Sequence, residues 1–132
     1  MIETLLEQLQ SFAASEKMIN AVLLVGSHAK GTAGPDSDVD LVLITSDPDR
    51  YLRNRRWLER FGIVLNWELE DYQLVQSLRV FYENGPEVEF GITSLDWIAE
   101  SQLQSTGKIL SGGYRVIHDP ANLIDGFCRR AK

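Results

Sequence analysis

Apolar residues recur every three or four positions over residues 2–13, and polar residues occupy the positions between them. This spacing gathers the apolar side chains on one side of a helix, so the segment predicts an amphipathic helix packed on a core. Two mostly apolar runs, residues 20–25 and 39–44, predict buried strands. Residues 28–37, between the two runs, are rich in Gly, Pro, Ser and Thr and predict a loop with room for one helical turn.

The rest of the chain predicts further strands and helices. A helix is expected to start at Ser46–Pro48 and to end near Gly62, and another is expected to start at Ser94. A closing helix is expected after Pro120, and Asn84–Gly85 predicts a tight turn. Apolar alternation predicts strands over 63–70, 78–82, 88–92 and 114–117. No internal repeat or long linker divides the chain, so a single domain over residues 1–132 is expected.

Composition narrows the classes of function. The chain has 132 residues, a formal net charge of −6 and one cysteine, Cys128. An acidic chain repels the phosphate backbone, which argues against a nucleic-acid partner. A single cysteine excludes an intrachain disulfide and fits a reducing cytoplasm. No apolar stretch approaches the roughly 18 residues of a membrane span, and no signal-peptide pattern opens the sequence, so a cytoplasmic protein without a membrane partner is expected.

Acidic residues stand at the start of one predicted strand and inside another. Asp38 and Asp40 are two positions apart, so their side chains point to one face and their charges repel. Magnesium, which prefers hard oxygen ligands, would offset that repulsion. A third carboxylate is expected from Glu89, which leaves its strand among apolar neighbours. Glu87, on the same face but nearer the turn, is the competing candidate.

The residues that follow the first buried strand are candidates for binding a phosphate group. Gly26 lets the backbone turn sharply and approach a ligand, and the nearby N–H groups and the Ser27 hydroxyl can cradle phosphate oxygens. Lys30 is either a phosphate contact or a flexible loop lysine. His28 is either a contact to the triphosphate or to the acceptor, or a partly exposed loop residue.

Residues 26–31 and 35–41 together resemble the signature of the DNA polymerase beta-like nucleotidyltransferase superfamily. That signature is Gly-Ser, a spacer and Asp-x-Asp, followed later by a third acidic residue on a strand. The likeness is greatest to minimal and aminoglycoside-adenylyltransferase-type members. The resemblance implies an α/β (α+β) fold, in which helices flank a mixed sheet. It also implies a magnesium-dependent enzyme that transfers a nucleoside monophosphate, with ATP the expected donor, to a hydroxyl of a small molecule or protein.

The resemblance also assigns roles to residues. It implies that Asp38 and Asp40 hold two magnesium ions and that Glu89 completes the catalytic one. Gly26 and Ser27 would contact the triphosphate. One departure concerns Glu89, a glutamate where relatives commonly carry aspartate. The longer side chain shifts a metal ligand, and misplacing a ligand by about 1 Å can cost on the order of 100-fold in rate. Another is histidine at position 28, where many relatives carry arginine.

Two further hypotheses belong to other classes of function. The chain is similar to minimal nucleotidyltransferase antitoxins, which implies a binding partner in the form of a small helical toxin. A large exposed apolar patch, for example on the N-terminal helix, would favour that hypothesis. The third hypothesis is a member of the fold that binds nucleotide but does no chemistry.

Overall fold

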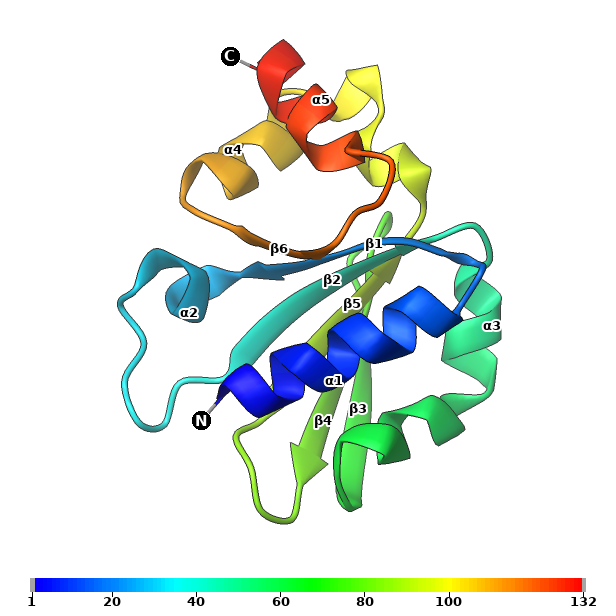
Figure 1. Cartoon of the computed structure of the whole chain (residues 1–132), viewed down its shortest axis with the longest axis vertical. Coiled ribbons are helices and arrows are strands. Elements are labelled where there is room, and N and C mark those ends of the chain that lie inside the picture. The colour runs from blue at the N-terminus through cyan, green and yellow to red at the C-terminus, as the bar shows by residue number, and fades with distance from the viewer. Residues whose placement is uncertain (1, 132) are drawn as a thin grey trace.

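The computed structural model describes residues 2–131 and shows a six-stranded sheet with helices on both faces (Figure 1). The strands are β1 (Ile19–Val25), β2 (Val39–Thr45), β3 (Val64–Asp71), β4 (Gln76–Tyr82), β5 (Val88–Thr93) and β6 (Arg115–His118). Their order across the sheet is β3-β4-β5-β2-β1-β6. The pairing is parallel between β2 and β5 and antiparallel between the other neighbours. The mixed sheet with flanking helices confirms the predicted fold class.

The helices are short except at the N-terminus. The α-helices are α1 (Ile2–Ser15), α2 (Gly26–Lys30), α3 (Pro48–Arg53), α4 (Ser105–Ser111) and α5 (Leu123–Ala131). The 3-10 helices are η1 (Arg55–Phe61), η2 (Leu95–Ile98) and η3 (Glu100–Gln102). Among the described residues, no helix combines the length and the apolar character that a bilayer crossing requires.

One face of the sheet is covered by α1, α3 and η1 (Figure 1). The apolar stripe of α1 is buried there as predicted, and Leu9 of α1 has no exposed surface. Aromatic rings fill the space between the helices and the sheet. Trp57 stacks on Phe12 with ring centroids 5.7 Å apart and meets Phe90 of β5 edge-on at 5.0 Å. Pairs of this kind add to the stability that the buried area itself provides.

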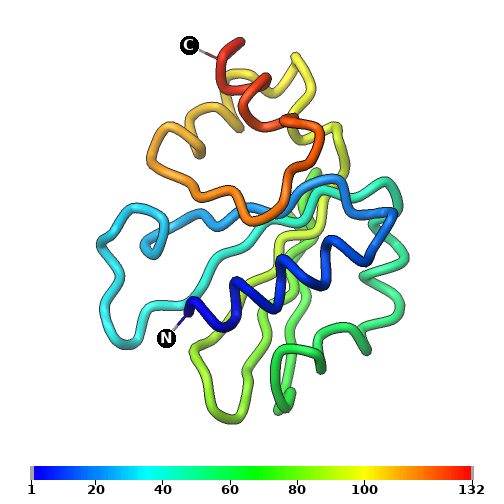
Figure 2. The backbone as a smooth tube through the Cα atoms, viewed as in Figure 1, coloured from blue at the N-terminus to red at the C-terminus, as the bar shows by residue number. Residues whose placement is uncertain are grey.

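The other face is covered only over part of its width. The helices α4 and α5 pack over β1 and β2, as the path of the chain in Figure 2 shows. Leu23 and Ile44 of those strands meet Leu110 and Phe127 of the helices in a second apolar cluster. This cluster contains no buried residue of β4 or β5 among the described part of the chain. The helices α4 and α5 therefore leave the second face of those two strands outside this cluster.

The helix expected over residues 48–62 is two separate pieces. Asn54 has extended backbone, with φ −108° and ψ 102°, and ends α3. Its side-chain oxygen accepts a hydrogen bond of 3.2 Å from the backbone N–H of Arg56, which opens η1. Asparagine breaks helices in this way because its side chain competes for backbone donors. The prediction of one helix was wrong, although Tyr51 and Leu58 are buried as expected.

The segment after Ser94 also differs from the prediction. The Ser94 hydroxyl accepts a hydrogen bond of 3.2 Å from the N–H of Asp96, so the expected cap is present. The element it opens is the short η2, followed by η3. The prediction did not include α4, because Ser105 and Gly107 weaken the helical pattern there.

The edge strand β3 exposes large apolar side chains. Leu65 is 65% exposed and Leu69 is 52% exposed, because the helix layer ends at η1 and does not cover this strand. Trp67 is partly covered by the guanidinium of Arg55, which lies 4.0 Å from the ring centroid. Three exposed apolar side chains thus lie on β3, whereas the apolar stripe of α1, the example given with the binding-partner hypothesis, is buried.

Candidate functional site

Three acids meet at the middle of the sheet. The parallel pairing of β2 with β5 sets Asp40 directly opposite Glu89. Neighbouring strands lie about 4.8 Å apart, so the two side chains leave the open face at the same level. Asp38 precedes β2 and joins them: one carboxylate oxygen from each acid lies within 4.8 Å of the others. The structure therefore brings together the three acids that were predicted to form one site.

The surroundings of Asp40 change its protonation. The pKa of Asp40 is raised to about 7 from its ordinary value of 3.8. Burial is the main cause, followed by the negative charge of Asp38 and the contact with Glu89, whereas the positive charge of Arg79 acts in the opposite sense. A divalent cation among the three oxygens would offset the same repulsion, and an all-carboxylate donor set suits magnesium. The donor set therefore fits the metal that the sequence implies.

Gly26 follows the end of the neighbouring strand β1 and lies against the Asp40 carboxylate. Its φ of +74° lies in the left-handed region that favours glycine. A Cβ at this position would collide with the Asp40 carboxylate oxygen and would lie 3.1 Å from its Cγ. The close approach that the sequence predicted for Gly26 is therefore made to the acid beside it.

The loop between α2 and β2 is closed by its own polar residues. The Ser27 carbonyl accepts a hydrogen bond of 3.0 Å from the N–H of Thr32. The His28 Nε2 lies 3.4 Å from the Ser37 carbonyl oxygen, and the Ser37 hydroxyl accepts from the N–H of Gly34 at 2.9 Å. Ser27 and His28, both predicted ligand contacts, thus also hold the loop that leads the chain to the acids.

A cleft of about 480 Å³ opens beside the acids and is lined by Gly26, Asp40 and Glu89. Two lysines reach it from different helices, Lys30 from α2 and Lys108 from α4. A larger hollow, of about 580 Å³, lies between α1 and η1, but it includes none of the predicted site residues. The cleft is therefore the part of the surface where acids, lysines and the glycine turn come together.

Glycines keep the cleft open. A Cβ on Gly91 of β5 would lie 3.0 Å from Val75 Cγ1 and 3.3 Å from the Leu41 carbonyl oxygen. A Cβ on Gly112, just after α4, would lie 3.0 Å from Lys30 Cε. The absence of side chains at these two positions leaves space for the cleft and for the Lys30 side chain.

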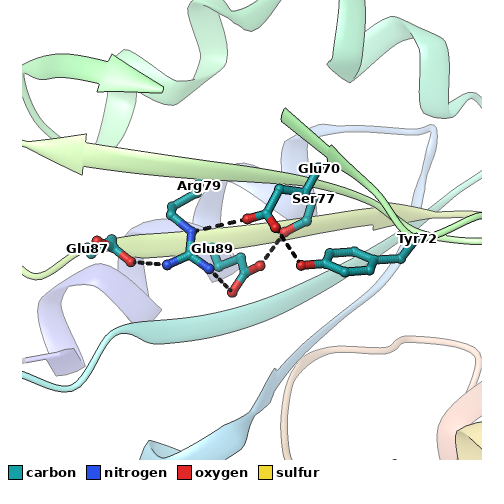
Figure 3. A network of polar contacts seen from close by, with 6 residues as sticks. All are labelled: Glu70, Tyr72, Ser77, Arg79, Glu87 and Glu89. Atoms are coloured by element: carbon teal, nitrogen blue, oxygen red, sulfur yellow. Dashed lines mark hydrogen bonds and ion pairs between the residues drawn. The ribbon is translucent and has the colours of Figure 1, made fainter. Parts of the chain in front are cut away.

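A network of polar contacts surrounds Glu89 on the side of β4 (Figure 3). The Ser77 hydroxyl donates to Glu89 Oε1 at 2.8 Å, and Arg79 Nη2 lies 3.7 Å from Glu89 Oε2. Arg79 also pairs with Glu87 at 2.6 Å and with Glu70 at 3.3 Å. Glu89 therefore joins the acid cluster, whereas Glu87, the competing candidate, is engaged by the arginine.

Sequence reasoning did not single out several residues of this site. Ser77 and Arg79 lie on β4, and Lys108 lies on the α4 helix that the sequence did not predict. Tyr72, which also lines the cleft, follows β3. The signal in the sequence was that the polar Ser77 and Arg79 alternate with the apolar Leu78 and Val80.

Comparisons with known proteins agree with this architecture. The sequence model of the streptomycin adenylyltransferase family matches residues 1–123. The fold is similar to that of an aminoglycoside 6-adenyltransferase from Bacillus subtilis, with a TM-score of 0.54, 15% identity and coverage of 69% of this chain and 34% of that one. It is also similar to a CCA-adding enzyme in complex with CTP, with a TM-score of 0.50, 14% identity and coverage of 93% and 32%. The chain thus spans about a third of either protein. No curated protein matches the sequence.

Proposed function

Because the chain belongs to the streptomycin adenylyltransferase family, we propose that it transfers a nucleoside monophosphate from a nucleoside triphosphate to a hydroxyl group. The observation that carries the proposal is the meeting of Asp38, Asp40 and Glu89 within 4.8 Å beside a cleft. ATP is the proposed donor, since the family takes its name from adenylyl transfer. The acceptor is a hydroxyl of a small molecule or of a protein side chain.

The three acids are proposed to hold two magnesium ions, which when bound stabilise the charge that develops on the attacking and leaving oxygens at the α-phosphorus. Gly26 leaves the space that the Asp40 carboxylate occupies, because a side chain at this position would collide with it. Ser77 orients Glu89 through its 2.8 Å hydrogen bond. We assign to the Glu89 carboxylate the acceptance of the proton from the acceptor hydroxyl.

The nucleotide is proposed to lie in the cleft of about 480 Å³, a size typical of small-molecule sites. Lys30 and Lys108 line it from two helices and would neutralise the triphosphate. The backbone at Gly26 and Ser27 would approach the phosphate oxygens, as the sequence predicts. His28, held near Ser37 in the same loop, would contribute by keeping the loop closed.

The experiment that tests the proposed function uses labelled ATP, magnesium and a panel of hydroxyl acceptors that includes streptomycin and the protein itself. Transfer of labelled AMP with release of pyrophosphate is expected. Asp38→Asn and Asp40→Asn should each remove the signal, since each removes a ligand charge. A signal that survives both substitutions would show that the acid cluster is not the catalytic site.

The same experiment separates the competing hypotheses. If no acceptor is modified but calorimetry detects magnesium-dependent ATP binding, the chain is an inert nucleotide-binding member of the fold. If neither binding nor transfer is detected, the proposed function is wrong. Co-purification with a small helical protein would favour the antitoxin hypothesis, which stays a prediction from the sequence.

Lys108→Ala is expected to raise the KM for ATP by roughly 10-fold to 100-fold, with a smaller effect on kcat. The reason is that a charged hydrogen bond to phosphate contributes about 1.5–3 kcal/mol. Steady-state kinetics at saturating magnesium would measure the change. Lys17→Ala, at an exposed lysine outside the cleft, is the matched control and should behave as the wild type. An unchanged KM in the Lys108 variant would contradict the placement of the triphosphate.

A further inference from the structure

Each side of the Arg79 guanidinium faces a different carboxylate. Nη1 lies 2.6 Å from Glu87 Oε2, Nε lies 3.3 Å from Glu70 Oε1, and Nη2 lies 3.7 Å from Glu89 Oε2. Figure 3 shows the three acids arranged around one guanidinium.

The contact to Glu89 is the longest of the three. At 3.7 Å it exceeds hydrogen-bond range, so Arg79 attracts Glu89 by charge without occupying its lone pairs. The other oxygen of Glu89, Oε1, accepts from the hydroxyl of Ser77, a residue that is only 3% exposed. Residues of β4 thus contact both oxygens of Glu89. Oε1 accepts a hydrogen bond from Ser77, whereas Oε2 has only the longer contact to Arg79.

Two acids keep the guanidinium in this position. Glu87 makes the shortest contact, and Glu70 is in turn fixed by the Tyr72 hydroxyl, which donates to Glu70 Oε2 at 2.7 Å. A guanidinium released from these acids would be drawn to the remaining one, because an arginine fork and a carboxylate form a strong bidentate pair. Such a pair would occupy the Glu89 oxygens that a cation needs.

We propose that Arg79 is a positioning residue for Glu89 and that Glu87 anchors Arg79 so that it orients Glu89 without competing with the metal. The proposal rests on the proposed function, since it concerns the third carboxylate of that site. It also assigns a role to Glu87, which the sequence left as the competing candidate to Glu89. Partners that orient metal-binding carboxylates commonly change metal affinity or activity by roughly 10-fold to 100-fold when replaced.

If the contacts of Arg79 served only to stabilise the pairing of β3, β4 and β5, the result would be different. In that case, substitution of Arg79 or Glu87 would lower the thermal unfolding temperature and leave the magnesium affinity unchanged. The deciding readout is therefore magnesium binding to the protein without nucleotide, measured by calorimetry. Thermal unfolding of each variant, and separate kcat and KM values for ATP, complete the measurement.

Glu87→Gln is expected to weaken magnesium binding by roughly 10-fold, because the freed guanidinium pairs with Glu89. The kcat at saturating magnesium should stay within about twofold of the wild type, since the metal then displaces the guanidinium. In the Arg79→Gln background the same Glu87 substitution should have no effect on magnesium binding, because no guanidinium remains to be released. Glu83→Gln, at an exposed acid of the same hairpin, is the control.

Arg79→Gln alone is expected to lower kcat by roughly 10-fold to 100-fold with little change in the KM for ATP, and Arg79→Lys should restore part of kcat. The inference is overturned if Glu87→Gln binds magnesium as the wild type does, or if its effect persists without Arg79. It is also overturned if kcat survives the loss of Arg79. Failure of the proposed function is distinguishable, because the wild type itself would then show no transfer, whereas failure of this inference leaves wild-type transfer intact.

Discussion

Asp40→Asn is expected to abolish magnesium-dependent nucleotidyl transfer and, at the same time, to stabilise the metal-free protein above pH 7. Transfer is lost because the substitution removes one of the three carboxylates that meet beside the cleft. Stability is gained because the ionised Asp40 lies close to Asp38 and Glu89 and is partly withdrawn from water. An amide of the same shape carries no charge, so it removes that repulsion.

The direction of the pH dependence follows from the shifted pKa. Asp40 has a folded pKa of about 7 and an ordinary value of 3.8, so the folded state binds the proton more tightly than the unfolded state. The stability that this proton contributes is complete below the unfolded pKa and is lost as the pH rises through 7. A shift of this size corresponds to about 4 kcal/mol for a fully buried group. Because Asp40 is only half-buried and screened by solvent, we expect roughly 1–2 kcal/mol.

Chemical unfolding of the metal-free wild type and the Asp40→Asn variant at pH 5 and pH 8 would measure this difference. The variant should be more stable by roughly 1–2 kcal/mol at pH 8, and the difference should shrink at pH 5. Magnesium should stabilise the wild type and not the variant. Asp36→Asn is the matched control, since this exposed aspartate of the loop that precedes β2 lies outside the acid cluster. Equal stability of wild type and variant at both pH values would contradict the crowding of the acids.

Gly26→Ala is expected to lower the transfer rate by on the order of 100-fold and to destabilise the fold by roughly 1–3 kcal/mol. Two effects combine at this position. The backbone has a φ of +74°, and a new Cβ would collide with the Asp40 carboxylate. The displaced carboxylate would no longer lie opposite Glu89, so the acid cluster would lose its geometry.

Gly31→Ala separates these two effects. Gly31 has a φ of +77°, close to that of Gly26, but a Cβ there would have no neighbour within 4 Å. This variant should therefore lose about 1 kcal/mol of stability from backbone strain and keep its transfer activity. Thermal unfolding and labelled-AMP transfer on both variants would measure the contrast. Equal losses of activity in the two variants would show that strain, and not contact with Asp40, explains the effect at Gly26.

Most of the secondary structure could be predicted from local patterns. Burial of one face gives α1 its helical spacing of apolar residues. Burial of both faces gives β1 and β2 their apolar runs. The break at Asn54 was missed because the surrounding apolar spacing continues through it. The exposure of β3 was missed because alternation indicates a strand but does not say whether a helix covers it.

The residues of the candidate site differ in how far their proximity can be predicted from neighbouring positions in the sequence. Asp38 and Asp40 lie two positions apart at the start of one predicted strand, so their proximity follows from local extended geometry. The choice of Glu89 over Glu87 depends on the register between β2 and β5, which lie far apart in the sequence. No local pattern carries that register, so the sequence favoured Glu89 from its place in the strand and kept Glu87 as the competing candidate.

The sequence by itself determined the strands, the acid pair and the glycine turn, because each depends on contacts between near neighbours along the chain. Only the tertiary structure decided that Glu89 completes the acid cluster, that Arg79 lies between Glu87 and Glu89, and that the α4 helix brings Lys108 to the cleft. The physical reason is that these contacts join separate strands and helices. Their positions depend on how the whole sheet pairs and on which part of its second face the helices leave uncovered.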